Sequence, residues 1–285
     1  MAELRIAYIV SAYKLPGQLD RLLHRLSGPG VAFAVHVDRR TSRGTYEEMV
    51  ARTRDLDVTF LSRHVSHWAS FGHVRATLKG LDHFVGEGKP FDYAVLLTGQ
   101  DYPLRSPAAI GEFLGSAGRR SFMSYRYLPF PPWGKRGGLE RIENWHVTKY
   151  RRLHLALPLR RRLPLGLRPW GGSAYWCLER DVVQYVHEFV RAHPEYVAFF
   201  EHVYVPDELF FQTIVLNSSL RNSVENEDLR YLDWTRRPAP AVLDQRDLPA
   251  LLSSTKLFAR KFDERVDAAV LDQLDAHIDA SPDPS

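Results

Sequence analysis

The segments IAYIV at residues 6–10 and VAFAVHVD at residues 31–38 decide the fold. Each begins with a short, uninterrupted apolar run, which is typical of a strand buried on both faces of a sheet. Four leucines between them recur at the spacing of one helix face, namely Leu19, Leu22, Leu23 and Leu26. A strand, a helix and a strand within about forty residues predict a βαβ unit with two parallel strands.

The same alternation continues along the chain. Apolar runs predict further strands at 58–61, 93–97, 121–125, 171–178 and 229–234. Helical spacing predicts helices at 45–54, 71–81, 108–114, 182–192 (capped by Asp181), 206–217 and 266–278, and a short helical segment after Asp247 that reaches 257–263. No repeat or linker separates two cores. We therefore predict one α/β domain over 1–279, with a nucleotide-binding half at 1–115, an acceptor-binding and catalytic half at 116–279, and a frayed tail at 280–285.

Composition narrows the class of protein. The chain has 285 residues, of which 45% are hydrophobic and 25% are charged, as in ordinary globular proteins. Cys177 is the single cysteine, so no intrachain disulfide can form, which fits a reducing compartment. The first apolar run is too short for a signal peptide, and none approaches the roughly 18 apolar residues of a membrane span. These features predict a soluble, cytoplasmic protein.

Arginines are concentrated between residues 119 and 168, where they alternate with aromatic residues, prolines and glycines. We expect residues 128–171 to form a long irregular loop, which in a compact domain usually serves binding. A basic face attracts nucleic acid, anionic lipid headgroups or phosphorylated small molecules. The arginines do not share one helix or strand, and no nucleic-acid-binding motif occurs, so we expect no nucleic-acid partner. Aromatic side chains next to hydrogen-bond donors suit the binding of sugars, because a sugar ring has apolar faces and hydroxyl groups around its edge.

Two aspartates follow predicted parallel strands. Ligands of such sheets bind at the carboxyl ends of the strands, where Asp38 and Asp101 are expected. Asp38 can contact a nucleotide or cap the turn that follows it. Asp101 can contribute to the same edge or hold its own turn, 98–101.

The stretch PDELFFQT at residues 206–213 predicts the first turn of a helix, because proline is tolerated there and acidic residues favour the positive end of the helix dipole. Asp207 and Glu208 are caps on one interpretation. On the other, a carboxylate kept ionised at the helix start accepts a proton from a substrate. No metal site is predicted. Asp55 and Asp57 form the one Asp-x-Asp pair that could hold a metal ion, but they come before a predicted strand and therefore lie at the edge of the sheet opposite to the carboxyl ends of the strands.

Six segments in order resemble the core-2/I-branching β-1,6-N-acetylglucosaminyltransferase family, glycosyltransferase family 14, which includes the peptide O-xylosyltransferases. They are HVDRR at 36–40, LTGQDYPL at 97–104, GSAYW at 172–176, PDELFFQT at 206–213, LRYLDW at 229–234 and FARKFD at 258–263. The resemblance covers nearly the whole chain. It implies a GT-A-type, Rossmann-like fold and inverting transfer from a UDP-sugar.

The resemblance also implies roles for residues. Glu208 matches the general base, and Asp38 matches the aspartate that contacts the nucleotide. Lys261 matches the lysine of a basic pair that replaces a metal at the diphosphate. The matching arginine is Arg236 or Arg237, of which we prefer Arg236.

A donor or acceptor pocket is expected around the remaining candidates, which are Trp68, Asp101, Ser173, Tyr175, Trp176 and Asp207. Tyr175 and Trp176 can instead belong to the core, and Asp207 can be the structural acid of its helical turn. Ser173 lies in the loop that enters a strand, where it can touch donor or acceptor.

Several alternatives stay open. The transferred sugar is GlcNAc or xylose, and the acceptor is an oligosaccharide, a glycolipid, a peptide or a secondary metabolite. Animal members carry a membrane anchor and disulfides, so we expect no Golgi role here, although the basic loop leaves room for peripheral membrane contact. No cofactor is expected. The alternative function is a catalytically silent glycan- or nucleotide-binding protein of the same fold.

Overall fold

The computed structural model describes residues 4–149 and 153–280, which form two compact units. The first unit comprises Met1–Arg63, Pro90–Arg119 and Leu229–Ser285, and the second comprises His64–Lys89 and Arg120–Asp228. These units differ from the predicted halves, because the C-terminal segment packs with the N-terminal strands. That the chain is a single domain stays a prediction.

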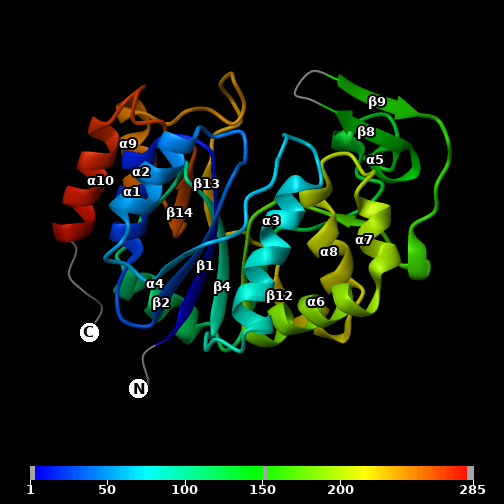
Figure 1. Ribbon diagram of the computed structural model, residues 1–285, viewed down its shortest axis with the longest axis horizontal. Helices are drawn as coiled ribbons and strands as arrows, with labels where there is room; N and C mark the ends of the chain where they lie inside the picture. Colours follow the sequence, from blue (N-terminus) through cyan, green and yellow to red (C-terminus); the bar gives the residue numbers. More distant parts are fainter. Residues whose placement is uncertain (1–3, 150–152, 281–285) are drawn as a thin grey trace. The chain divides into compact units, whose positions relative to one another are not determined.

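Four parallel strands form the centre of the first unit (Figure 1). They are β1 (Ile6–Ala12), β2 (Val31–Val37), β3 (Val58–Phe60) and β4 (Tyr93–Thr98), in the order β4-β1-β2-β3. In register, Ile6 lies opposite Val31 on one side and Tyr93 on the other. The buried apolar runs therefore predicted these strands and their parallel pairing correctly.

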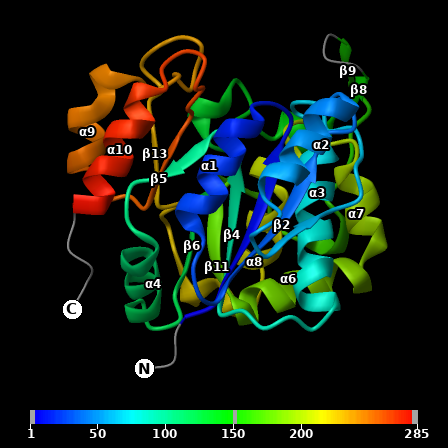
Figure 2. The same cartoon turned by 60° about the vertical axis from the view of Figure 1, so that its left-hand side comes forward.

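The first unit also contains α-helices. They are α1 (Pro16–Leu26), α2 (Arg43–Arg52), α4 (Pro107–Ser116), α9 (Leu248–Ser253) and α10 (Ala269–Ala280). Figure 2 shows α1 and α2 side by side over the strands. The four predicted leucines of α1 are buried. The last helix begins later than predicted, because Val266 precedes it and is exposed.

A second, three-stranded sheet of this unit contains β5 (Asp101–Pro103), β13 (Arg230–Leu232) and β14 (Phe258–Arg260), in the order β13-β14-β5. Strand β14 pairs parallel with β13 and antiparallel with β5. The short helical segment predicted after Asp247 is present as α9, but it ends at Ser253, and Phe258 and its neighbours pair in this sheet.

The second unit contains β6 (Ser121–Met123), β11 (Trp176–Glu179) and β12 (Val224–Glu225), with β6 antiparallel to β11 and parallel to β12. Its helices are α3 (Gly72–Leu81), continued by the π-helical turn η1 (Asp82–Gly86), α6 (Arg180–Ala192), α7 (Pro194–Phe200) and α8 (Phe210–Leu216), with a 3-10 turn η5 (Ser219–Ser223). The cap of α6 is Glu179, whose side chain accepts a bond from the Asp181 N–H, so the prediction of Asp181 as the cap is wrong.

Residues 128–171 are more ordered than predicted. They include η2 (Pro131–Trp133), α5 (Glu140–Glu143), η3 (Pro164–Gly166) and an antiparallel hairpin of β8 (Trp145–Lys149) and β9 (Leu153–Leu157). A further short pair joins β7 (Arg126–Tyr127) to β10 (Trp170–Gly171). The expectation of irregular chain throughout is therefore wrong, because the prolines and glycines interrupt the segment without preventing short strands from pairing.

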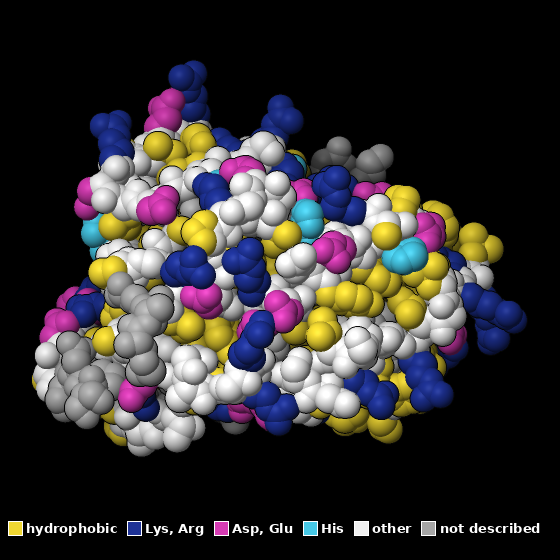
Figure 3. Space-filling model, turned by 90° about the horizontal axis from the view of Figure 1, so that it is seen from below, with side chains coloured by type: hydrophobic (Ala, Val, Ile, Leu, Met, Phe, Trp, Pro, Cys, Tyr) yellow, Lys and Arg dark blue, Asp and Glu magenta, His cyan; other side chains and the backbone are white. Residues whose placement is uncertain are grey.

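The structure confirms the predicted class, an α/β fold with a mostly parallel central sheet flanked by helices. Cys177 is a free, buried thiol, as predicted. In the part of the chain that the structure describes, no helix is long and apolar enough to cross a membrane. On the face shown in Figure 3, Lys and Arg side chains are interspersed with Asp and Glu.

Candidate active site

The carboxyl ends of β1, β2 and β4 meet at one edge of the first unit. Asp38 continues the ladder through its N–H, which donates to the Ala12 carbonyl (3.0 Å), and the Gly99 N–H donates to the Ser11 carbonyl (2.9 Å). The turns after these strands therefore start side by side. This edge is where parallel sheets bind ligands, as predicted for this chain.

Asp38 is buried at this edge and bound to Arg40. One Asp38 oxygen accepts the Arg40 N–H (2.8 Å), and the other pairs with the Arg40 guanidinium (2.7 Å). Arg63 donates to the Asp38 carbonyl (3.0 Å) and fixes the loop further. The turn-capping role is therefore present in the structure, and the nucleotide contact stays a prediction.

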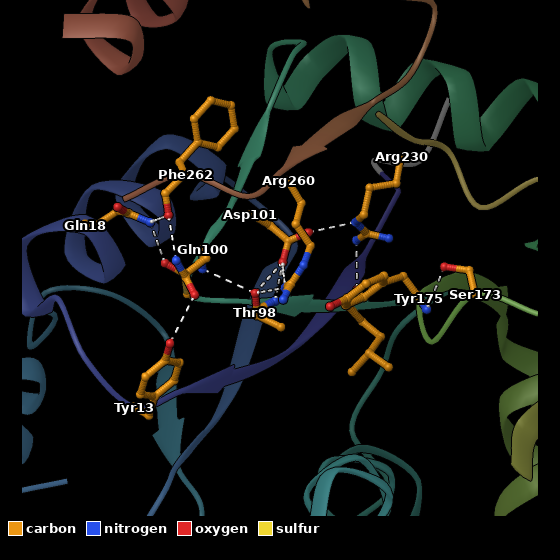
Figure 4. Close-up of polar contacts among 12 residues, drawn as sticks. Tyr13, Gln18, Thr98, Gln100, Asp101, Ser173, Tyr175, Arg230, Arg260 and Phe262 are labelled. Carbon is orange, nitrogen blue, oxygen red and sulfur yellow. Dashed lines mark hydrogen bonds and ion pairs between the residues drawn. The ribbon is translucent and has the colours of Figure 1, made fainter. Parts of the chain in front are cut away.

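Asp101 has a fully buried side chain that forms an ion pair with Arg230 (2.7 Å), whose side chain is equally buried. Its second oxygen accepts bonds from the N–H (2.7 Å) and hydroxyl (2.6 Å) of Thr98, as Figure 4 shows. Arg260 also contacts Thr98 and Asp101. Of the two roles proposed for Asp101, the geometry favours holding the turn over lining a pocket.

Arg230→Met is expected to lower the free energy of unfolding by about 3–5 kcal/mol, because it removes the fully buried ion-pair partner of Asp101 and leaves only the longer contact with Arg260 (3.3 Å). Chemical denaturation measures the change. Replacing both residues at once, Arg230→Met with Asp101→Leu, should recover most of the loss. A single variant as stable as the wild type would contradict a structural role for this pair.

The segment after β14 is anchored on the turn after β4. The Phe262 N–H donates to the Gln100 carbonyl (2.9 Å), and the Gln100 side-chain amide donates to the Phe262 carbonyl (2.9 Å). Gln18 donates to the carbonyls of Gly99 (2.8 Å) and Phe262 (3.3 Å) (Figure 4). These buried amides, whose role the sequence did not reveal, place Lys261 at the same edge.

Lys261 is a partly buried cation with no ion-pair partner among the described residues. Burial lowers its pKa, and repulsion from Arg260 and Lys14 lowers it further. The charge of Lys14 is already paired with Asp263 (2.6 Å). Lys261 therefore offers an uncompensated positive charge, which an anion such as a diphosphate would stabilise.

The two competing arginines differ in their surroundings. Arg236 donates to Asp233 (2.7 Å) and Asp247 (2.5 Å), and Asp244 lies 3.6 Å away. Arg237 is exposed, and its side chain forms no ion pair or hydrogen bond with any of the described residues. Because carboxylates surround Arg236, the geometry favours Arg237 for an added anion, opposite to our preference from the sequence.

Glu208 belongs to the second unit and lies in a 3-10 turn, η4 (Pro206–Glu208). Leu209 has a φ of −134°, which is not helical and separates this turn from α8. No side chain caps the start of α8. The prediction of one helix from Pro206 is therefore wrong in detail. Asp207 and Glu208 precede α8 and do not lie in its first turn.

The Glu208 carboxylate accepts a charge-assisted bond from Arg141 (2.6 Å), and its main-chain carbonyl accepts the Gly172 N–H (2.8 Å). Burial raises the pKa of Glu208, the charge of Asp207 raises it further, and Arg141 acts in the opposite direction. The position before α8 therefore does not lower the pKa of this carboxylate, and the opposing charge comes from Arg141. A carboxylate with a raised pKa is a stronger base than an ordinary glutamate.

Arg141 is held in turn by Trp133. Its guanidinium lies 4.2 Å from the centroid of the indole ring, a cation–π contact. The ring occupies space that Gly171 leaves, since a Cβ there would lie 2.5 Å from a Trp133 ring carbon. Sequence reasoning missed Arg141, because nothing in the sequence distinguishes it from the other arginines of its segment.

Arg141→Gln is expected to move the acidic limb of the pH profile of kcat/KM upward by about one pH unit or more. A general base works only when deprotonated, and loss of the cation raises the pKa of Glu208 further. Rates measured across the acidic range test this. Arg141→Lys keeps the charge and should shift the limb less, and an unshifted limb in both variants would contradict the coupling.

The other candidates of the second unit have different positions. Trp68 is 71% exposed, packs edge-on against Tyr204 (6.0 Å), and adjoins Ala69, whose carbonyl accepts the Val205 N–H (3.2 Å). Trp68 thus lies near the Glu208 turn and suits a sugar platform.

Ser173 accepts the Tyr175 N–H (3.3 Å), and the Ser173 carbonyl is fixed by the buried Gln212 amide. Tyr175 is partly buried. Trp176 is fully buried against Phe211 (5.7 Å), so its role as a sugar platform is wrong and it belongs to the core.

Comparisons with known proteins match this chain to one enzyme family and to several glycosyltransferases. The sequence profile of the Core-2/I-branching enzyme family matches residues 6–250. Xylosyltransferase 2 of Rattus norvegicus is 28% identical over 98% of this chain and 34% of its own length. Beta-glucuronosyltransferase GlcAT14A of Arabidopsis thaliana is 25% identical over 96% of this chain and 64% of its own length. The chain thus spans about a third of the length of the xylosyltransferases that it matches.

Among solved structures, a 4-diphosphocytidyl-2C-methyl-D-erythritol synthase from Anaerococcus prevotii aligns with 66% of this chain and 76% of its own. The TM-score is 0.36 and the sequence identity 8%, which is too weak a similarity to support an argument.

Proposed function

Because the chain belongs to the core-2/I-branching enzyme family, we propose that it is an inverting, metal-independent glycosyltransferase. It moves a sugar from a UDP-sugar to an acceptor hydroxyl and forms a β-linkage. The observation that carries this proposal is Lys261, a partly buried cation without a carboxylate partner in the described residues. Such a group supplies the positive charge that a departing diphosphate requires.

The chemistry assigned to Glu208 is general base catalysis. The acceptor oxygen attacks C1 of the donor sugar, and the bond from C1 to the diphosphate oxygen breaks with its electron pair leaving on UDP. Glu208 takes the proton of the acceptor hydroxyl. Its raised pKa supports this role, since proton transfer is most efficient when the pKa of the base approaches the working pH.

We propose that the donor sugar is GlcNAc, xylose or glucuronic acid. The resemblance points to GlcNAc or xylose, and the names of the relatives add glucuronic acid. Glucuronic acid carries a carboxylate, which GlcNAc and xylose lack. A panel of UDP-GlcNAc, UDP-xylose and UDP-glucuronic acid therefore separates the alternatives.

Thermal shift with this panel, with and without EDTA, tests the proposal. Ligands that bind the folded state raise the melting temperature. We expect one UDP-sugar to stabilise the protein more than UDP alone, and we expect EDTA to leave the shift unchanged. Loss of the shift in EDTA would contradict metal independence, and absence of any shift would contradict UDP-sugar binding. Hydrolysis of the bound donor would exclude the silent binding protein.

A further inference from the structure

Strands β7 and β10 and the neighbouring turns carry a surface that the proposed chemistry does not use. We call it the aromatic-basic surface. It consists of Arg126, Tyr127, Phe130, Lys135, Arg168 and Trp170.

Backbone pairing brings these residues together within the second unit. Tyr127 lies opposite Trp170 in register, with ring centroids 5.4 Å apart, and the Leu128 N–H donates to the Pro169 carbonyl (3.2 Å). The Arg126 guanidinium lies 4.6 Å from the centroid of the Phe130 ring. The Phe130 N–H donates to the Gly137 carbonyl (2.8 Å), which brings in the turn that holds Lys135.

The charge of this surface is uncompensated. Its three cations, Arg126, Lys135 and Arg168, are exposed, and none pairs with a carboxylate in the described residues. Exposed arginines on helices behave differently, since Arg43 pairs with Glu47 (2.7 Å) and Arg75 with Glu201 (2.8 Å). The aromatic-basic surface therefore keeps a local positive field that attracts anions.

A series of side-chain contacts connects the aromatic-basic surface to the proposed base, Glu208. Phe130 packs edge-on against Trp133 (6.2 Å), Trp133 carries Arg141, and Arg141 holds Glu208. Three successive side-chain contacts thus connect the surface to the group assigned to take the acceptor proton. Tyr127, 49% exposed, presents ring area to that ligand.

We propose that the aromatic-basic surface binds an anionic oligosaccharide, so that the acceptor continues beyond the reacting sugar as a glycan bearing carboxylate or sulfate groups. This rests on the proposed function. The exposed ring of Tyr127 offers a flat apolar face to a pyranose ring, and the unpaired cations bind the acidic groups. An acidic peptide would use the cations and leave the ring faces without a matching partner.

Calorimetric titration tests the proposal with four probes of similar length. They are an oligogalacturonide, which carries carboxylates, a sulfated chondroitin oligosaccharide, a neutral malto-oligosaccharide and oligoglutamate. We expect one or both anionic oligosaccharides to bind and the neutral one to bind at least about tenfold more weakly. The first two probes distinguish carboxylate from sulfate recognition. Oligoglutamate binding as tight as the better glycan would overturn the proposal, as would failure of both glycans to bind.

Variants separate stacking from charge. Tyr127→Ala and the double variant Arg126→Gln with Lys135→Gln should each weaken glycan binding by about tenfold, whereas Arg43→Gln, an exposed arginine of the first unit, should not. Donor hydrolysis without acceptor should stay unchanged in all of them, so a failure of this proposal is distinct from a failure of the proposed function. Unchanged glycan affinity in Tyr127→Ala would overturn the stacking role.

Discussion

Glu208→Gln is expected to reduce sugar transfer by about 10²–10⁴-fold, the usual contribution of a positioned general base. Glutamine keeps the shape of the side chain and its ability to meet Arg141, but it cannot accept the proton of the acceptor hydroxyl. UDP affinity should stay close to that of the wild type, because the base does not bind the diphosphate. Steady-state kinetics and calorimetry with UDP measure the two quantities.

The neighbouring carboxylate provides a matched control. Asp207→Asn removes a charge that raises the pKa of Glu208. We expect this variant to keep turnover and to move the acidic limb of the pH profile downward, since Glu208 then stays deprotonated to a lower pH. Turnover retained in Glu208→Gln, or lost in both variants to the same extent, would show that Glu208 is not the base.

Lys261→Ala is expected to weaken UDP binding by about 10- to 100-fold, the range for loss of a hydrogen bond to a charged group. Burial and the neighbouring cations Arg260 and Lys14 disfavour the charged form of Lys261, and no carboxylate among the described residues pairs with it. A diphosphate would supply the missing counter-charge. Calorimetric titration with UDP measures the affinity.

The arginines next to β13 refine this test. Arg237→Gln should also weaken UDP binding, because Arg237 has no carboxylate partner among the described residues. Arg236→Gln should lower stability more than affinity, since Asp233, Asp244 and Asp247 surround that side chain. If Lys261→Ala left UDP affinity unchanged, the diphosphate would have to be neutralised by other residues.

The strands of the first unit could be predicted because each is a run that must be buried on both faces. Ile6–Ala12 and Val31–Val37 have no polar residue that would let them face water, apart from Ser11 and the buried His36. The antiparallel pair of strands at 145–149 and 153–157 was missed, because it lies within a segment whose prolines, glycines and arginines predicted irregular structure.

The site was predictable in type and not in detail. The Pro-Asp-Glu segment indicates where a base can stand, but its protonation depends on Arg141, which is 67 residues away in the sequence. Asp101 likewise satisfies the motif, yet its role depends on Arg230, 129 residues away. Such pairings arise from tertiary structure, so sequence spacing alone cannot distinguish a buried structural carboxylate from one that meets a substrate.

Proton NMR of a UDP-sugar incubated with the protein and an acceptor in EDTA tests the central claim most directly. We predict that the anomeric signal of the α-linked donor decays, that UDP accumulates and that a β-anomeric product signal grows, all at the same rate. Under identical conditions Glu208→Gln should leave the donor intact. A donor that the wild-type protein leaves intact with every UDP-sugar and acceptor tested, or a product with retained α configuration, would contradict the proposed inverting, metal-independent transfer.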